Sequence, residues 1–146
     1  LNSAREKLLA ALDAMEAELS VPSGQIVLGG FSQGSMLSLD LALRSPRPLA
    51  GLILFSTTML CRNEWQAGMS ARRGLRVFQS HGQLDPLLPF FVAEALRDAL
   101  RQAGLSVEFL PFRGAHEIPA AVLRGTSEFL HATLAAAAGS PGTGHV

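Results

Sequence analysis

A glycine-flanked serine lies where a predicted strand meets a predicted helix. It is Ser32, in the G-x-S-x-G pattern of Gly30–Gly34. The apolar, β-branched run Gln25–Gly29 before it is typical of a buried strand, and a helical stretch, Met36–Leu43, follows it. A serine at such a junction occupies a tight, strained turn in which flanking side chains would clash, hence the glycines. The junction predicts that the hydroxyl of Ser32 is held at the carboxyl end of a sheet.

Two roles are open for Ser32 on this pattern alone. It would serve as the N-cap of a helix that begins between two glycines. Alternatively it is a nucleophile, with free N–H groups of the helix N-terminus available to a developing oxyanion. The backbone N–H of Gln33 is then one oxyanion donor, because that residue directly follows the nucleophile.

An acid and a histidine follow Ser32 in the order known from hydrolases with this serine turn. Asp85 comes after the strand-like run Leu75–Gln79, and His116 comes after Val107–Phe112. The carboxyl ends of parallel strands share one edge of the sheet, so the three side chains are expected to converge there. The chain order and the strand ends make Ser32 the candidate nucleophile, His116 the candidate base and Asp85 the candidate acid that orients the histidine. The alternative for His116 is a structural residue of its loop.

Other carboxylates are weaker candidates for the acid. Glu64, in the irregular segment Ser56–Gly74, is the loop alternative. Asp40, Glu94 and Asp98 fall on predicted helices, where solvated or ion-paired carboxylates are expected.

The remaining histidines and the cysteine favour structural roles. His81 ends a strand four residues before Asp85 and is expected to support that loop by a hydrogen bond. His131, in the last helix, and His145, in the tail, are expected to face solvent, and Cys61 to be a small apolar or loop residue. No two ligand-type residues stand at metal spacing on one helix, so neither a metal nor a cofactor is expected.

The pattern of apolar residues predicts alternating helices and strands. The predicted strands are Gln25–Gly29, Leu49–Phe55, Leu75–Gln79 and Val107–Phe112, the last suited to a sheet edge. The predicted helices are Ser3–Leu19, opened by a Ser3/Glu6 capping box, Met36–Leu43, Phe91–Ala103, and one from Pro119 to about Ala138.

Three motifs together resemble the phospholipase/carboxylesterase branch of the α/β-hydrolases, the group that includes acyl-protein thioesterases. They are G-F-S-Q-G at Gly30–Gly34, H-G-x-x-D-P at His81–Pro86, and G-x-H-E-I-P at Gly114–Pro119. The likeness runs from about Val21 to Leu134, which is nearly the whole chain.

The resemblance implies an α/β-hydrolase fold, a three-layer sandwich around a parallel sheet, with Ser32, Asp85 and His116 as the catalytic triad. Ser35 and Ala115 stand where the family usually has glycines, and neither position carries the chemistry. The family's His-Gly-rich oxyanion loop, which precedes the nucleophile, is not among these residues. The resemblance therefore implies only the C-terminal part of the fold.

The first predicted strand is expected to lack a neighbour on one side. Gln25–Gly29 is apolar on both faces, as in an interior strand, but only Leu49–Phe55 is an obvious partner. The other edge would expose unpaired N–H and C=O groups. We therefore expect residues 1–138 to form a single, partial domain followed by a flexible tail, 139–146. Either a missing upstream segment or a second copy would cover the edge.

Composition narrows the possible partners. Hydrophobic residues make up 48% and charged residues 16%, in keeping with a parallel sheet covered on both faces. The net charge is zero, with 12 basic and 12 acidic side chains, so neither nucleic acid nor a membrane surface is an expected partner. No apolar run could span a bilayer, and Leu1–Lys7 lack the apolar core of a signal peptide. A single cysteine is compatible with a reducing cytoplasm.

The expected function is hydrolysis of a carboxylic ester or thioester through an acyl-enzyme on Ser32. A serine peptidase shares the fold and the triad order, and a catalytically silent fragment or interaction module is the alternative outside enzymes. The loops near Ser32 carry no charge, which favours a short to medium uncharged acyl chain, although the same residues would also pack the loops themselves. These residues are Thr57, Met59, Leu60, Leu84 and Leu87.

Overall fold

The computed structural model describes residues 1–22 and 24–139. Four strands form one sheet: β1 (Val27–Phe31), β2 (Gly51–Phe55), β3 (Arg76–Gly82) and β4 (Ser106–Phe112). The helices are α1 (Asn2–Leu19), α2 (Gln33–Arg44), α3 (Arg62–Met69), α4 (Phe90–Gln102) and α5 (Ala120–Gly139), with a short 3₁₀ turn, η1 (Ser70–Arg72). Each predicted strand and helix is present, with ends shifted by a few residues.

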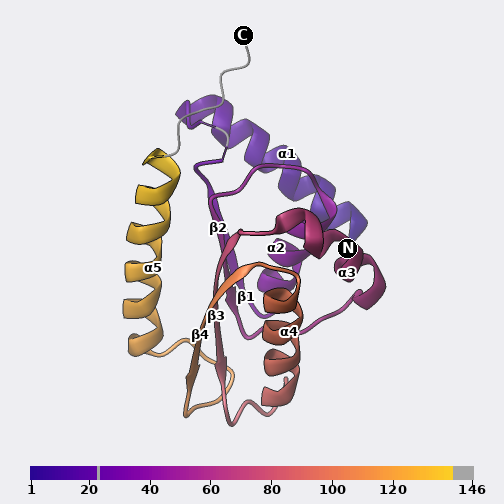
Figure 1. The fold of residues 1–146 in the computed structure, drawn as a ribbon, viewed down its shortest axis with the longest axis vertical. Helices are drawn as coiled ribbons and strands as arrows, with labels where there is room; N and C mark the ends of the chain where they lie inside the picture. Colours follow the sequence, from indigo (N-terminus) through magenta and orange to yellow (C-terminus); the bar gives the residue numbers. More distant parts are fainter. Residues whose placement is uncertain (23, 140–146) are drawn as a thin grey trace.

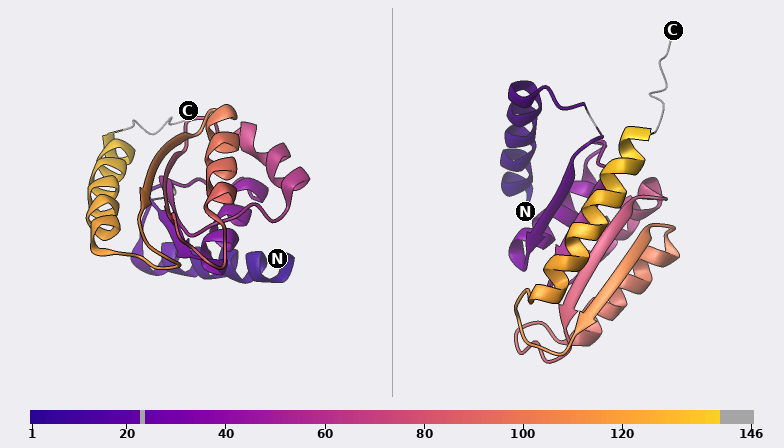
Figure 2. Two further views of the ribbon diagram at one scale, coloured as in Figure 1. Left: turned by 90° about the horizontal axis from the view of Figure 1, so that it is seen from below. Right: turned by 90° about the vertical axis from the view of Figure 1, so that its left-hand side faces the viewer.

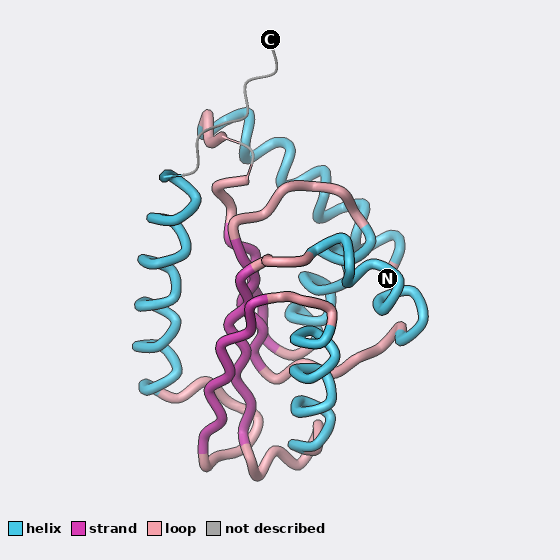
Figure 3. The backbone as a smooth tube through the Cα atoms, viewed as in Figure 1, coloured by secondary structure: helices cyan, strands magenta, loops and turns pink. Residues whose placement is uncertain are grey.

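The sheet is entirely parallel and lies between two helical layers. Its strand order is β1-β2-β3-β4, and each neighbouring pair is parallel. Helix α5 covers one face alone, while α2, α3 and α4 cover the other and α1 lies beside α2 (Figures 1 and 2). Because the strands are parallel, their carboxyl ends share one edge of the sheet, and the loops that follow β3 and β4 at that edge lie at the bottom of Figure 3. The expected three-layer α/β sandwich is confirmed.

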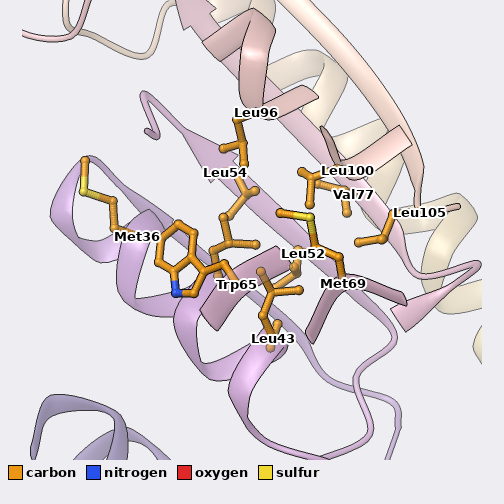
Figure 4. Close-up of a cluster of buried hydrophobic side chains, with 12 residues drawn as sticks. Met36, Leu43, Leu52, Leu54, Trp65, Met69, Val77, Leu96, Leu100 and Leu105 are labelled. Carbon is orange, nitrogen blue, oxygen red and sulfur yellow. The ribbon is translucent and has the colours of Figure 1, made fainter. Parts of the chain in front are cut away.

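Burial on both faces explains the apolar strands. Alternate residues of β2 enter two separate cores, with Leu52 and Leu54 on one face and Ile53 on the other. The larger core, shown in Figure 4, joins the sheet to α2, α3 and α4 around the fully buried Trp65. The smaller core packs Phe78 against α5. The edge position predicted for the last strand is also confirmed, since β4 ends the sheet.

A buried carboxylate ties three helices together. Asp40 is 0% exposed; it accepts a hydrogen bond from Arg5 of α1 at 2.6 Å and another from the indole N–H of Trp65 of α3 at 2.8 Å. Of the two expectations for Asp40, the ion-paired one is therefore confirmed and the solvated one is wrong. Because a buried charge needs such partners, Asp40 fixes α1 and α3 on α2.

Two local predictions are wrong. The first helix begins at Asn2 with Leu1 at the N-cap position and no capping hydrogen bond from a side chain, so the Ser3/Glu6 box does not form. The segment Ser56–Gly74, expected to be irregular, contains α3 and η1. Trp65 and Met69, one helical turn apart, are the buried residues of α3, and this spacing holds the short helix on the core.

The edge of the sheet opposite β4 lies at β1. Among residues 1–22 and 24–139, β2 is the only strand that pairs with β1, as expected from the sequence. No helix in those residues is long and apolar enough to cross a membrane. Gly139, predicted to begin the tail, ends α5 instead, and the remainder of the tail, with His145, lies outside the described residues.

Strand β1 and helix α2 pass unusually close to each other at Gly30. A Cβ atom at Gly30 would come closer than 3.0 Å to the backbone of Gly34 and Ser35, whereas a Cβ at Gly34 would meet nothing within 4 Å. The prediction that both flanking glycines avoid a clash therefore holds for Gly30 and is wrong for Gly34. Backbone cannot move aside as a flexible side chain can, so the strand-to-helix turn depends on Gly30.

We predict that Gly30→Ala and Gly34→Ala have very different effects on stability. Gly30→Ala is expected to lower the free energy of unfolding by about 2 kcal/mol or more, because it forces α2 away from β1. Gly34→Ala is expected to change it by about 0.5 to 1 kcal/mol in the stabilising direction, as for an open helical site. Urea unfolding of the two variants measures both values. Equal destabilisation by the two substitutions would contradict the packing described for the turn.

Candidate active site

Ser32 occupies a strained turn between β1 and α2. Its backbone has φ 53° and ψ −118°, and residues other than glycine rarely adopt a positive φ. The N–H of Ser32 donates to the carbonyl of Phe55, at the end of β2, at 2.8 Å. Strain of this kind persists only where neighbouring structure holds it, and it is concentrated at functional sites.

The side chain of Ser32 does not cap the helix. Ser32 is the N-cap residue of α2, as the structural alternative expects, but its side chain makes no capping hydrogen bond. Within the described residues the hydroxyl of Ser32 has no hydrogen-bond partner of any kind. Gln33 is the first residue of α2, and helix geometry leaves its N–H without an acceptor in the helix. A free hydroxyl and a free N–H donor therefore lie side by side.

Asp85 is buried and fully hydrogen-bonded. Its Oδ1 accepts from the N–H groups of Leu87 at 2.8 Å and Leu88 at 2.9 Å, and its Oδ2 lies 2.7 Å from Nδ1 of His116. Burial opposes ionisation, but the hydrogen bonds from Leu88, His116 and Leu87 outweigh it and hold the pKa of Asp85 below its usual range. Asp85 is therefore an ionised acceptor at neutral pH.

The carboxylate of Asp85 determines the tautomer of His116. An ionised carboxylate only accepts hydrogen bonds, so Nδ1 of His116 is the donor, and in the neutral ring Nε2 is then the acceptor nitrogen. The His116 side chain is 15% exposed. Its ring packs on the ring of Phe31, the residue before Ser32, with the centroids 4.7 Å apart. The imidazole therefore lies next to the serine turn, with Nδ1 bound to Asp85.

A close crossing of two loops brings His116 to this position. β4 and β1 lie at opposite edges of the sheet, so the loop after β4 must pass over the end of β3 to approach Ser32. At the crossing, a Cβ on Gly82 would be closer than 3.0 Å to the carbonyl oxygens of Gly114 and Ala115. Backbone hydrogen bonds from Gln83 to Phe112 and from Leu84 to Gly114 join the loops. The need for glycine at position 82 is not evident from the sequence, because the clashing backbone belongs to a distant loop.

His81 supports the Asp85 loop, as predicted. It is 0% exposed; its Nε2 lies 2.8 Å from the carbonyl oxygen of Leu88 and 3.6 Å from Oδ2 of Asp85. The hydrogen bond from Nε2 of His81 to Leu88 fixes the turn whose N–H groups hold the carboxylate.

The alternative acid and the exposed histidine lie elsewhere. Glu64 is exposed in the first turn of α3, whereas Asp85 is the carboxylate that contacts His116. His131 is exposed on α5, as predicted. In the part of the chain that the structure describes, no three histidine, cysteine or acidic side chains are grouped so that they could hold a metal ion.

The residues predicted to line an acyl site fall into two groups. Thr57 is fully buried and Met59 packs against the larger core, so both also have structural roles. Leu60, Leu84 and Leu87 are 49%, 65% and 68% exposed. Three apolar side chains therefore face solvent on the loops that follow β2 and β3.

Comparison with known proteins identifies the family of this chain. A family model of phospholipases/carboxylesterases matches residues 2–134. Acyl-protein thioesterase 1 of Mycosarcoma maydis is 37% identical over 82 residues, which are 56% of this chain and 34% of that protein. Acyl-protein thioesterase 1 of Neurospora crassa is 29% identical over 102 residues, 68% of this chain and 42% of that protein.

A solved structure has the same architecture. The esterase PE8 superposes with a TM-score of 0.82 at 28% identity, over 90% of this chain and 61% of that one. The chain thus spans less than half the length of these two thioesterases and about three fifths of this esterase. The match of the family model over nearly every described residue, together with the parallel sheet and the serine turn, shows that this chain belongs to the phospholipase/carboxylesterase family of α/β-hydrolases.

Proposed function

We propose that the protein is a serine hydrolase that cleaves carboxylic esters or thioesters through an acyl-enzyme on Ser32. The observation that carries the proposal is the pair formed by His116 and the buried, ionised Asp85, with the ring of His116 packed on the residue next to Ser32. Similarity to proteins named thioesterases and esterases supports hydrolysis of esters or thioesters as the reaction. No step in it requires a metal or a cofactor.

Each residue of the triad has a role that follows from its surroundings. Nε2 of His116 takes the proton of the Ser32 hydroxyl as its oxygen attacks the acyl carbonyl. Asp85 stabilises the resulting imidazolium, which then protonates the leaving alcohol or thiol as the carbonyl re-forms. Water repeats the sequence on the acyl-enzyme, releases the carboxylic acid and restores the hydroxyl of Ser32.

The oxyanion of the tetrahedral intermediate needs hydrogen-bond donors. The N–H of Gln33 is the first, since it follows the nucleophile at the start of α2. A strand paired with the free edge of β1 would end beside Ser32, and we propose that the loop after such a strand supplies the second donor. That strand would come from another segment of the same protein or from a second copy of the chain.

Two other functions use the same residues. A serine peptidase of this fold would need the same triad, and a silent interaction module would retain it without turnover. The apolar Leu60, Leu84 and Leu87 favour an acyl substrate over a peptide, which needs hydrogen-bonding partners for its backbone. Turnover of a simple ester by the purified protein excludes the silent module.

We predict that substitutions in the triad abolish ester hydrolysis to different degrees. Ser32→Ala and His116→Ala are each expected to lower kcat on the order of 10⁶-fold in the protein with its complete oxyanion site. Asp85→Asn is expected to lower kcat by about 10⁴-fold, because the imidazole keeps its place but loses the required tautomer. Hydrolysis of a p-nitrophenyl ester measures all three. Glu64→Gln is the control, and a crippled Glu64→Gln enzyme beside a normal Asp85→Asn enzyme would identify Glu64 as the acid.

We also predict a preference for short to medium uncharged acyl chains. The exposed leucines offer apolar contact without a charge. Each methylene added to the acyl chain therefore strengthens its binding by at most about 0.8 kcal/mol, until the leucine surface is covered. Rates for esters from acetyl to palmitoyl, compared with an acyl chain of similar length that carries a terminal carboxylate, measure the preference. Faster turnover of the charged chain than of the butyryl ester would refute it.

A further inference from the structure

Two buried hydroxyl groups beneath the serine turn form a chain that ends on Ser32. We propose that Ser35 and Thr57 are positioning residues, which hold the backbone of the nucleophile and thereby orient the oxyanion donor on Gln33. The proposal rests on the proposed role of Ser32 as nucleophile. It assigns a role to Ser35, for which the sequence predicted no part in the chemistry, and to Thr57, which was expected only to line the substrate site.

The hydrogen bonds of the chain run in one direction. The hydroxyl of Thr57 donates to Oγ of Ser35, and the hydroxyl of Ser35 donates to the carbonyl oxygen of Ser32 at 2.5 Å. Both side chains are 0% exposed. Because Thr57 satisfies Ser35 as an acceptor, the proton of Ser35 remains directed at Ser32, and water does not compete for either group.

Both polar groups of the Ser32 backbone are hydrogen-bonded. The N–H of Ser32 donates to the carbonyl of Phe55 at the end of β2. The carbonyl of Ser32 accepts from the N–H groups of Ser35 at 3.0 Å and Met36 at 3.1 Å, and the Ser35 hydroxyl, itself held by Thr57, adds a third and shorter hydrogen bond. A residue with φ 53° relaxes unless its surroundings hold it. The segment from Phe55 to Thr57 therefore fixes the turn on both sides of the nucleophile.

The geometry of the peptide bond transmits this constraint to the oxyanion donor. The carbonyl of Ser32 and the N–H of Gln33 belong to the same peptide group, which is planar with the two bonds pointing in opposite directions. A hydroxyl that fixes the Ser32 oxygen beneath the turn consequently fixes the direction of the Gln33 N–H above it. Preorganised donors of this kind are the ones that lower a transition-state barrier, since they need no reorganisation during the reaction.

Helical serines and threonines often donate to a carbonyl one turn back, and that alone would not indicate a role in positioning. Ser38 donates to Gly34 at 2.9 Å and Thr126 donates to Val122 at 2.8 Å in this way. Ser35 differs in two ways. Its acceptor is the carbonyl of the proposed nucleophile, and its own oxygen accepts a hydrogen bond from Thr57, which lies outside α2. Ser38 is therefore a matched control on the same helix.

The test compares Thr57→Val and Ser35→Ala with Ser38→Ala in the full-length protein. Thr57→Val keeps the branched shape and removes the hydroxyl. Thr57→Val and Ser35→Ala are each expected to lower kcat by about 10-fold, because each removes one buried hydrogen bond that supports the transition state. The rate at which a fluorophosphonate modifies Ser32 should fall by about the same factor, while KM changes less than about 2-fold. Ser38→Ala should stay within about 2-fold of wild type in every rate. Thr57→Ser, which keeps the hydroxyl, should restore most of the loss.

Three results would overturn the proposal. They are rates for Thr57→Val equal to those of Ser38→Ala, a Thr57→Ser enzyme as slow as Thr57→Val, and a change in KM with kcat intact. Hydrogen exchange of the peptide containing Ser32 and Gln33 adds a readout without turnover, and it should accelerate in Thr57→Val and not in Ser38→Ala. If Ser35→Ala fails to fold, the comparison of Thr57→Val with Thr57→Ser is sufficient for the test. A wild-type protein without turnover would instead contradict the proposed function.

Discussion

The candidate site depends on the crossing of the loop after β4 over Gly82. The sheet places β1 and β4 at opposite edges, so the histidine and the serine start on strands that never touch. Only a position without a Cβ lets the backbone at Gly114 and Ala115 pass over the end of β3. Two backbone hydrogen bonds then lock the crossing, and His116 meets Asp85 beneath it and Phe31 beside it.

Two carboxylates are buried among residues 1–22 and 24–139, and their partners distinguish a structural role from a chemical one. Asp40 is paired with the guanidinium of Arg5, a partner that stays charged at any relevant pH, and so it acts as a fixed anchor between helices. Asp85 has only backbone N–H groups and a histidine as direct hydrogen-bond partners. Its side-chain partner is therefore an imidazole, the side chain that most often transfers protons in acid–base chemistry.

Much of this arrangement could be predicted from the sequence, because the relevant signals are local. Apolar runs marked all four strands, and the positions of Ser32, Asp85 and His116 at strand ends were enough to expect that the three converge. The crossing at Gly82 and the contact between Phe31 and His116 could not be read in this way, since each depends on a partner distant along the chain.

The incorrect predictions also have physical causes. A helix with only Trp65 and Met69 buried leaves too short a periodic pattern to identify, so α3 was taken for an irregular segment. Gly34 matched the motif, but a Cβ atom would clash only at Gly30, which lies against the backbone of α2, whereas a Cβ at Gly34 would enter open space. Ser35 looked like a neutral departure from the family pattern, and its contact with Ser32 became evident only with Thr57 beside it.

The central claim is that Ser32 is a nucleophile activated by His116. The most direct measurement is to incubate the protein with a fluorophosphonate, digest it and locate the phosphonylated residue by peptide mass spectrometry. A single adduct on Ser32, lost on denaturation before labelling and strongly slowed in His116→Ala, is the predicted result. An adduct on another serine, or a Ser32 that reacts equally well in the His116→Ala protein, would contradict the account.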